Sequence, residues 1–208
     1  MKNNDNLNVS GHLEIYKVYD NGQEERVFDE ANTITSGMGV GLGLLYAGSG
    51  ATDITNFQIR YFQLGTEGDT VLNTYGVDQV SLVSALGQVA GASDYQTGVE
   101  SNIPLVNNNL MAWDGTSLLN SEGDAGWFFG DIPDNGIKRA DLNSVTYILY
   151  VDKNSCNNLG EPLNEVGLFM KNPLGTDPMV SNLVAYRPFT NILKTDDFAL
   201  VFKWTLNF

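Results

Sequence analysis

The stretch DDFALVFKWTLNF, residues 196–208, decides the fold class. From Phe198 onward, large apolar side chains alternate with smaller or polar ones, which is the two-residue period of a strand with one buried face. The apolar positions are Phe198, Leu200, Phe202, Trp204, Leu206 and Phe208. A face with four aromatic rings would be a large exposed apolar patch unless a second layer covered it. We therefore expect this strand to pair within a sheet and to pack against other elements.

Other segments also have the pattern of strands. Three of them precede the final strand: SVTYILYVD at 144–152, EVGLFM at 165–170 and LVAYRPF at 183–189, all rich in β-branched or aromatic residues. Near the other end, residues 12–28 alternate on both sides of Asp20-Asn21-Gly22. An Asn-Gly pair favours the two-residue type I′ turn of a hairpin, since that turn needs positive φ at both positions. We therefore predict a β-hairpin over 12–28.

A short helix is expected after Thr33. Ser36 is a suitable N-cap, an apolar run extends to Tyr46, and Gly48 is a suitable end. The run contains four glycines, each of which costs a helix about 1 kcal/mol relative to alanine. We therefore expect this helix to form only where it packs closely on a sheet.

The chain returns to strand periodicity after the helix and then becomes hard to interpret. Alternation predicts Phe57, Ile59 and Tyr61 on one face of a strand, with Gln58, Arg60 and Phe62 on the other and a polar loop over 65–70. Residues 73–142 are short apolar pieces cut by turn residues, which indicates a loop-rich excursion. The sequence thus predicts a mainly β single domain over 1–208. Its expected architecture is an antiparallel β-sandwich, jelly-roll-like, with one short N-terminal helix and a long middle insertion.

The excursion contains a group of aromatic residues with two interpretations. Trp113, Trp127, Phe128 and Phe129 lie between turn residues. Aromatic side chains in such places more often anchor a long loop onto its own core. The same residue types are enriched at the centres of protein interfaces, so these four are the candidate interface.

Composition and charge exclude several classes of partner. Eleven Lys and Arg against 25 Asp and Glu give a net charge of -14, which opposes binding to nucleic acid or to an anionic membrane surface. No segment approaches the roughly 18 apolar residues of a membrane span, and the first residues lack the pattern of a signal peptide. Cys156 is the only cysteine, so an intrachain disulfide is excluded. We expect a soluble, unexported protein.

No pattern of catalytic or metal-binding residues emerges. The chain has a single histidine, His12, so neither a nucleophile–imidazole triad nor a zinc site with three nitrogen or sulfur ligands can be assembled. Residues 152–163 fail the EF-hand pattern, and the glycines of 36–45 fit neither nucleotide-binding pattern. Four acidic residues lie in turn-rich sequence near Trp127: Glu122, Asp124, Asp131 and Asp134. Such residues are more typical of ordinary solvated loops than of the carboxylate pair of a glycosidase. We expect no enzyme activity, cofactor or metal.

Four short motifs follow one another along the chain: Thr35-Ser36-Gly37, then 62–67 (FQLGTE), 165–169 (EVGLF) and 204–208 (WTLNF). Together they resemble the motifs of small structural virion proteins of tailed bacteriophages. The resemblance covers 12–72 and 143–208. It implies a non-enzymatic structural subunit of the tail, baseplate, neck or fibre-attachment apparatus. It also implies localisation in a virion assembled in the host cytoplasm, with other virion structural proteins and further copies of the chain as partners.

Two alternatives remain beside this interpretation. A capsid decoration protein also needs only a compact fold and an acidic surface. A receptor-binding or carbohydrate-binding module would use the same aromatic residues to stack on sugar rings.

Five residues of the motifs are assigned structural roles: Gly65, Glu165, Gly167, Trp204 and Phe208. Gly167 permits close backbone approach or a bulge. A carboxylate in an apolar strand is costly to bury unless it is paired, so Glu165 is expected either to face solvent or to fix a local arrangement.

Overall fold

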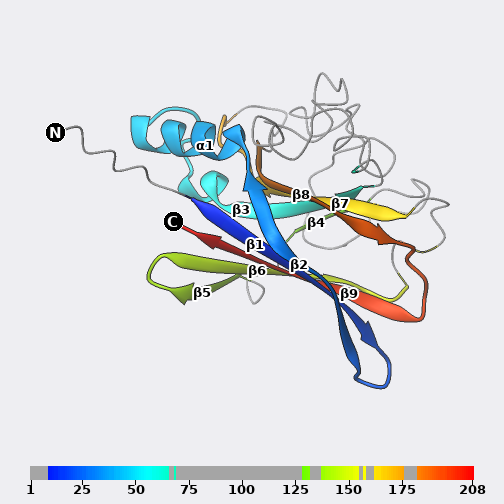
Figure 1. The fold of residues 1–208 in the computed structure, drawn as a ribbon. Coiled ribbons are helices and arrows are strands. Elements are labelled where there is room, and N and C mark those ends of the chain that lie inside the picture. The colour runs from blue at the N-terminus through cyan, green and yellow to red at the C-terminus, as the bar shows by residue number, and fades with distance from the viewer. Residues whose placement is uncertain are drawn as a thin grey trace.

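The computed structural model describes residues 9–65, 68, 128–131, 137–154, 157, 162–175 and 182–208. Figure 1 labels the elements of this part of the chain. The strands are β1 (Ser10–Tyr19), β2 (Glu24–Ile34), β3 (Ile59–Gly65), β4 (Phe128–Asp131), β5 (Ile137–Asp141), β6 (Ser144–Val151), β7 (Leu163–Met170), β8 (Asn182–Ile192) and β9 (Phe198–Asn207). The helices are α1 (Ser36–Ala47) and the 3₁₀ helix η1 (Ile54–Phe57).

The described strands form one antiparallel sheet that curls on itself. Their order is β4-β3-β7-β8-β2-β1-β9-β6-β5, and every described pair is antiparallel. Strand β2 joins the two halves, because most of its length pairs with β1 whereas Thr33 and Ile34 pair with β8. Figure 1 shows β2 crossing from the β1–β9–β6 half to the β3–β7–β8 half. The mainly β, antiparallel prediction is confirmed. The sandwich and jelly-roll detail stays a prediction.

Strand β9 pairs within the sheet, as its sequence predicted, and lies at the centre of one half. It pairs with β1 on one side and β6 on the other. Its inward positions are buried, with Leu200, Phe202, Trp204 and Leu206 all 0% exposed. Phe208 follows the strand and is 39% exposed, but its backbone N–H donates to the carbonyl oxygen of Asn143 at 2.8 Å. The last strand is therefore held on both edges and along its buried face.

The two halves of the sheet pack against each other. The ring of Phe189 on β8 contacts the rings of Phe28 on β2 and Phe202 on β9, with centroids 6.2 and 6.0 Å apart. Strands β8 and β9 are separated by β2 and β1 in the sheet, so the contact with Phe202 crosses the interior. The core therefore lies inside the curl.

The hairpin predicted over 12–28 is confirmed as β1 and β2. Its turn differs from the expected two-residue type I′ turn, because Tyr19 N–H donates to the carbonyl oxygen of Gln23 and three residues lie between them. Gly22 has a φ of 81°, which is the left-handed conformation that closes a three-residue hairpin loop. The extra residue lets a single glycine supply the positive φ.

The predicted faces of β3 were wrong. Phe57 belongs to η1, and a register shift between Ile59 and Tyr61 inserts one extra residue opposite β7. Such a bulge reverses the alternation, so Ile59 is buried before it and Phe62 and Leu64 are buried after it. A simple period of two does not detect this change.

Two strands come from the end of the predicted excursion. Strand β4 adds to β3 at one edge of the sheet, and β5 adds to β6 at the other. Apart from Leu142, the rest of 73–142 lies outside the described residues.

Candidate contact surface and cavity

Helix α1 is held against the sheet at its first turn. The N-cap is Thr35 and not Ser36, and its hydroxyl donates to the carbonyl oxygen of Leu183 on β8 at 2.6 Å without capping the helix. The Thr35 N–H donates to the carbonyl oxygen of Val184 at 3.1 Å. Gly48, with φ 66°, ends the helix as predicted. The helix therefore begins at a position set by β8.

The solvent side of α1 carries almost no polar group. Its exposed residues are Gly39, Val40, Gly43, Tyr46 and Ala47. Val40 is 49% exposed and Tyr46 is 80% exposed, and the helix has no acidic residue in its first turn and no basic residue in its last. A surface helix normally presents charged or polar residues to water, and a helix that is apolar all round is normally buried. We call these five exposed residues the α1 surface.

Two glycines of the α1 surface have no packing role within the described part of the chain. A Cβ atom added to Gly39 or to Gly43 would meet nothing within 4 Å. Each of these glycines costs the helix about 1 kcal/mol relative to alanine. The expectation that the glycines permit close packing on the sheet therefore does not apply to these two.

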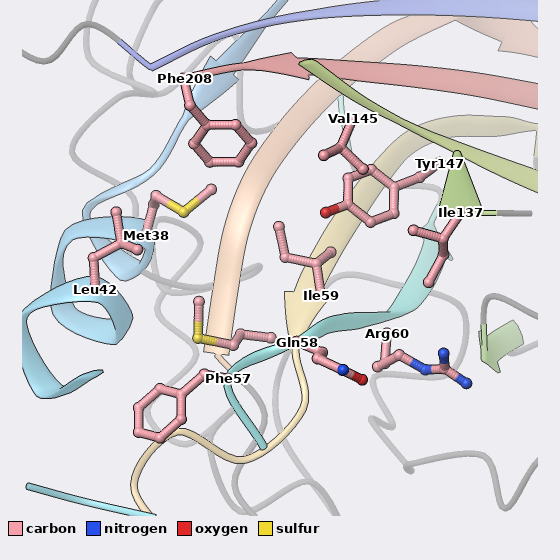
Figure 2. Close-up of a pocket in the computed structure, with 11 residues that line it drawn as sticks. Met38, Leu42, Phe57, Gln58, Ile59, Arg60, Ile137, Val145, Tyr147 and Phe208 are labelled. Carbon is pink, nitrogen blue, oxygen red and sulfur yellow. The ribbon is translucent and has the colours of Figure 1, made fainter. Parts of the chain in front are cut away.

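A cavity of about 480 Å³ opens between the two halves of the curled sheet (Figure 2). Helix α1 contributes Met38 and Leu42, and the segment leading into β3 contributes 57–60. The opposite wall comes from β5, β6 and the residue after β9, and consists of Ile137, Val145, Tyr147 and Phe208. Met170 of β7 also lines the cavity. The walls are mainly apolar, so the cavity favours an apolar occupant.

Tyr147 supplies a polar atom in this apolar wall. The residue is 6% exposed, and Figure 2 shows its hydroxyl pointing into the space between Ile59 and Phe208. Burial raises the pKa of Tyr147 to about 12, because a phenolate would be poorly solvated there. No hydrogen bond to this hydroxyl is formed by the described residues.

Trp204 lies beside Tyr147 and carries a fully buried polar atom that lacks a partner among the described residues. The two residues are register partners on β6 and β9 and therefore project from the same face. Trp204 is 0% exposed, and its Nε1 has no acceptor among the described residues. Buried indole N–H groups usually have a partner, so this pair marks an unusual point in the core.

The carboxylate predicted to fix a local arrangement is buried. Glu165 on β7 is 0% exposed, and the Tyr186 hydroxyl on β8 donates to its Oε2 at 2.6 Å. Burial, then the nearby carboxylate charge and this hydrogen bond, raise the pKa of Tyr186 well above its usual value. The pair joins two neighbouring strands, and of the two predicted environments for Glu165 the solvent-facing one is wrong.

Of the other residues with assigned structural roles, two glycines lie in the same half of the sheet, whereas Trp204 and Phe208 lie on and after β9 in the other half. Gly65 ends β3 opposite Glu165. Gly167 pairs with Gln63 on one side and Tyr186 on the other, and a register shift follows one residue later in β7.

The candidate interface falls mostly beyond what the structure describes. Trp113 and Trp127 lie outside the described residues, as do Glu122, Asp124 and Asp134. Phe128 and Phe129 are in edge strand β4, where their backbones pair with Leu64 and Gln63. Whether these aromatic side chains form a contact surface stays a prediction.

The described residues offer few of the groups used in catalysis or metal binding. His12 is on the exposed side of β1, with Nε2 2.6 Å from Oδ1 of Asp29. In the described ranges, no three His, Cys, Asp or Glu side chains are grouped so as to hold a metal ion. Of the helices that the structure describes, none has the length and apolar character needed to cross a membrane.

Lys194 is a buried cation that sequence patterns did not single out. It is 2% exposed, and its Nζ donates to the carbonyl oxygens of Lys153 and Thr195 and to Oδ1 of Asn157, at 3.0, 2.7 and 2.9 Å. Lys153 in turn pairs with Asp20 of the β1–β2 turn at 2.8 Å. These contacts join three connections at the end of the sheet, so we assign Lys194 a structural role.

Comparison of the chain with family models, with curated proteins and with solved structures finds no match. The resemblance to phage virion proteins therefore rests on the four sequence motifs alone.

Proposed function

We propose that the chain is a non-enzymatic structural subunit of a tailed-phage virion that works through protein–protein contacts. Its place would be the tail, baseplate, neck or fibre-attachment apparatus, and its partners would be other virion proteins and further copies of itself. The observation that carries the contact part of the proposal is the α1 surface, because an apolar helix face in water is costly unless a partner covers it.

The glycines of the α1 surface support this proposal independently of its apolar character. Gly39 and Gly43 are one helical turn apart, and the described packing does not require either of them. A partner that approaches the helix backbone closely would require both. Helix η1, which contacts α1, has an exposed apolar residue of its own, Ile54, which is 70% exposed.

The net charge supports protein partners over nucleic acid. At -14 the chain repels phosphate groups, so its attachment within a particle would use apolar contact and complementary protein charges. For the finer architecture, we propose the jelly-roll-like sandwich expected from sequence. Its two layers would be the facing halves of the curled sheet, whose contact through Phe189 and Phe202 favours this arrangement.

The experiment that tests the proposal replaces Gly39 and Gly43 together with alanine. Alanine should raise the helix stability of the isolated subunit by about 1 kcal/mol per site, because neither added methyl group meets another atom. In the particle the same methyl groups would hold the partner away. We therefore expect a higher melting temperature together with reduced incorporation into particles, measured by complementation of a phage that lacks the gene.

A charge variant provides the matched control. Val40→Glu places a carboxylate on the α1 surface, whereas Leu193→Glu places one at a 63% exposed apolar residue between β8 and β9. Only the first should reduce incorporation. Normal incorporation of both the double alanine variant and Val40→Glu would contradict the role of this surface in assembly.

The two alternative functions predict different results. A capsid decoration protein would be incorporated at the head. A carbohydrate-binding module would bind glycans as an isolated protein, which an array of immobilised glycans measures directly.

A further inference from the structure

We propose that the cavity bounded by α1, β3, β5 and β6 binds a small uncharged apolar molecule carrying one hydrogen-bond-accepting oxygen, which the Tyr147 hydroxyl contacts. This inference is separate from the proposed function, because the cavity is lined by Met38 and Leu42 on the inner side of α1 and not by the α1 surface.

The size and walls of the cavity fit a small organic molecule. Its volume of about 480 Å³ lies within the roughly 300–1,000 Å³ range of ligand pockets. Most of the lining is aliphatic, aromatic or thioether in character. A ligand there would replace water against apolar walls, which favours binding in proportion to the apolar area covered.

The Tyr147 hydroxyl determines which polar group the ligand needs. Tyr147 as a residue is 6% exposed, and its hydroxyl is directed into the cavity and forms no hydrogen bond with the described residues. With a pKa raised to about 12, the hydroxyl keeps its proton at neutral pH and is available as a donor. A ligand with one accepting oxygen at this point would take the place of solvent at this donor, while the rest of the ligand covers the apolar walls.

The lining also disfavours a charged ligand. Among the described residues on the lining, only Arg60 has an ionised side chain. Arg60 already takes part in an interaction of its own, and its guanidinium points away from Tyr147 in Figure 2. An anion in the cavity would therefore lose its hydration without gaining an unengaged cation. We expect a neutral carbonyl, ester, ether or alcohol to bind better than the corresponding carboxylate.

The test uses Prodan, a neutral apolar naphthalene ketone whose fluorescence changes in apolar surroundings and on hydrogen bonding at its carbonyl. We expect saturable binding of one Prodan per chain. Tyr147→Phe should weaken binding about threefold to tenfold, which corresponds to one lost hydrogen bond, and should shift the emission further to the blue. The matched control is Tyr150→Phe, on the outward face of the same strand, which should leave the dissociation constant unchanged.

Two further measurements keep the result interpretable. Val145→Trp fills the cavity and should abolish binding, with a cooperative melt of the variant showing that it is folded. Octan-1-ol should displace Prodan at a concentration at least tenfold lower than octanoate does. The proposal would be overturned by the absence of saturable Prodan binding, by equal affinity of wild type and Tyr147→Phe, or by equal displacement by the two competitors.

Discussion

The buried hydroxyl of Tyr147 makes the stability of the protein sensitive to alkaline pH in a way that one substitution should remove. The pKa of this group is raised from 10.0 to about 12 in the folded protein. Between these two values the unfolded chain releases a proton that the folded chain keeps. Raising the pH through this range therefore stabilises the unfolded state relative to the folded state. The part of the folding stability that depends on neutral Tyr147 is intact below pH 10 and is lost as the pH rises toward 12.

The expected magnitude follows from the shift. Two pKa units correspond to about 3 kcal/mol at full effect, of which roughly half should be lost by pH 11. The Tyr147→Phe variant has no proton to release, so its loss of stability between pH 8 and pH 11 should be smaller than that of wild type by about 1–2 kcal/mol. Tyr186, whose pKa is also raised, contributes a similar loss to both proteins and cancels in the comparison.

Urea unfolding of both proteins at the two pH values measures this difference. At pH 8 the two proteins should have nearly equal stability, because Tyr147 donates no hydrogen bond to the described residues. Tyr150 lies on the outward face of the same strand and is 49% exposed, so Tyr150→Phe should lose as much stability between the two pH values as wild type does. Equal losses in wild type and Tyr147→Phe would refute the reasoning, since they would show that burial does not hold the proton.

Three further predictions concern the contacts that stabilise the sheet. Deleting 205–208 removes the end of a strand paired on both edges and a fully buried leucine. The loss is at least about 2–5 kcal/mol of a typical 5–15, so calorimetry should show a much lower melting temperature, and an unchanged melt would contradict the structural role of this strand. Lys194→Met leaves buried acceptors unpaired and should lower the free energy of unfolding by at least about 1–3 kcal/mol, whereas Lys138→Met at the exposed edge should leave it unchanged. Tyr186→Phe should lower the free energy of unfolding, measured with urea, by about 1–3 kcal/mol, because the lost hydroxyl donates to a buried carboxylate. Tyr16→Phe, which removes the hydroxyl of a more exposed tyrosine–glutamate pair, is the control, and an equal loss in both variants would argue against this role.

Local patterns predicted the parts of the fold that depend on neighbouring residues. The alternation of 198–206 was sufficient to identify a strand with one buried face, and the glycine at position 48 was sufficient to end a helix. The bulge in β3 was not predicted, because the two-residue period on both sides of it appears continuous in the sequence.

The cavity and the buried lysine depend on contacts between distant segments. Met38, Ile59, Val145 and Phe208 lie far apart in the chain and meet only because the sheet curls. The acceptors of Lys194 are mostly backbone carbonyls, which every residue has, so no residue type marks the site in advance. A signal was present for the α1 surface, since glycines at 39 and 43 in an apolar helix are spaced to lie on one face.

The assignment to a virion is tested most directly by immunogold labelling of particles from the source lysate, with antibodies raised against this chain and negative-stain imaging. We predict gold at the tail, neck, baseplate or fibre attachment, whereas gold over the head would indicate a decoration protein. Gold on no particle, with free protein in the same lysate, would contradict the account.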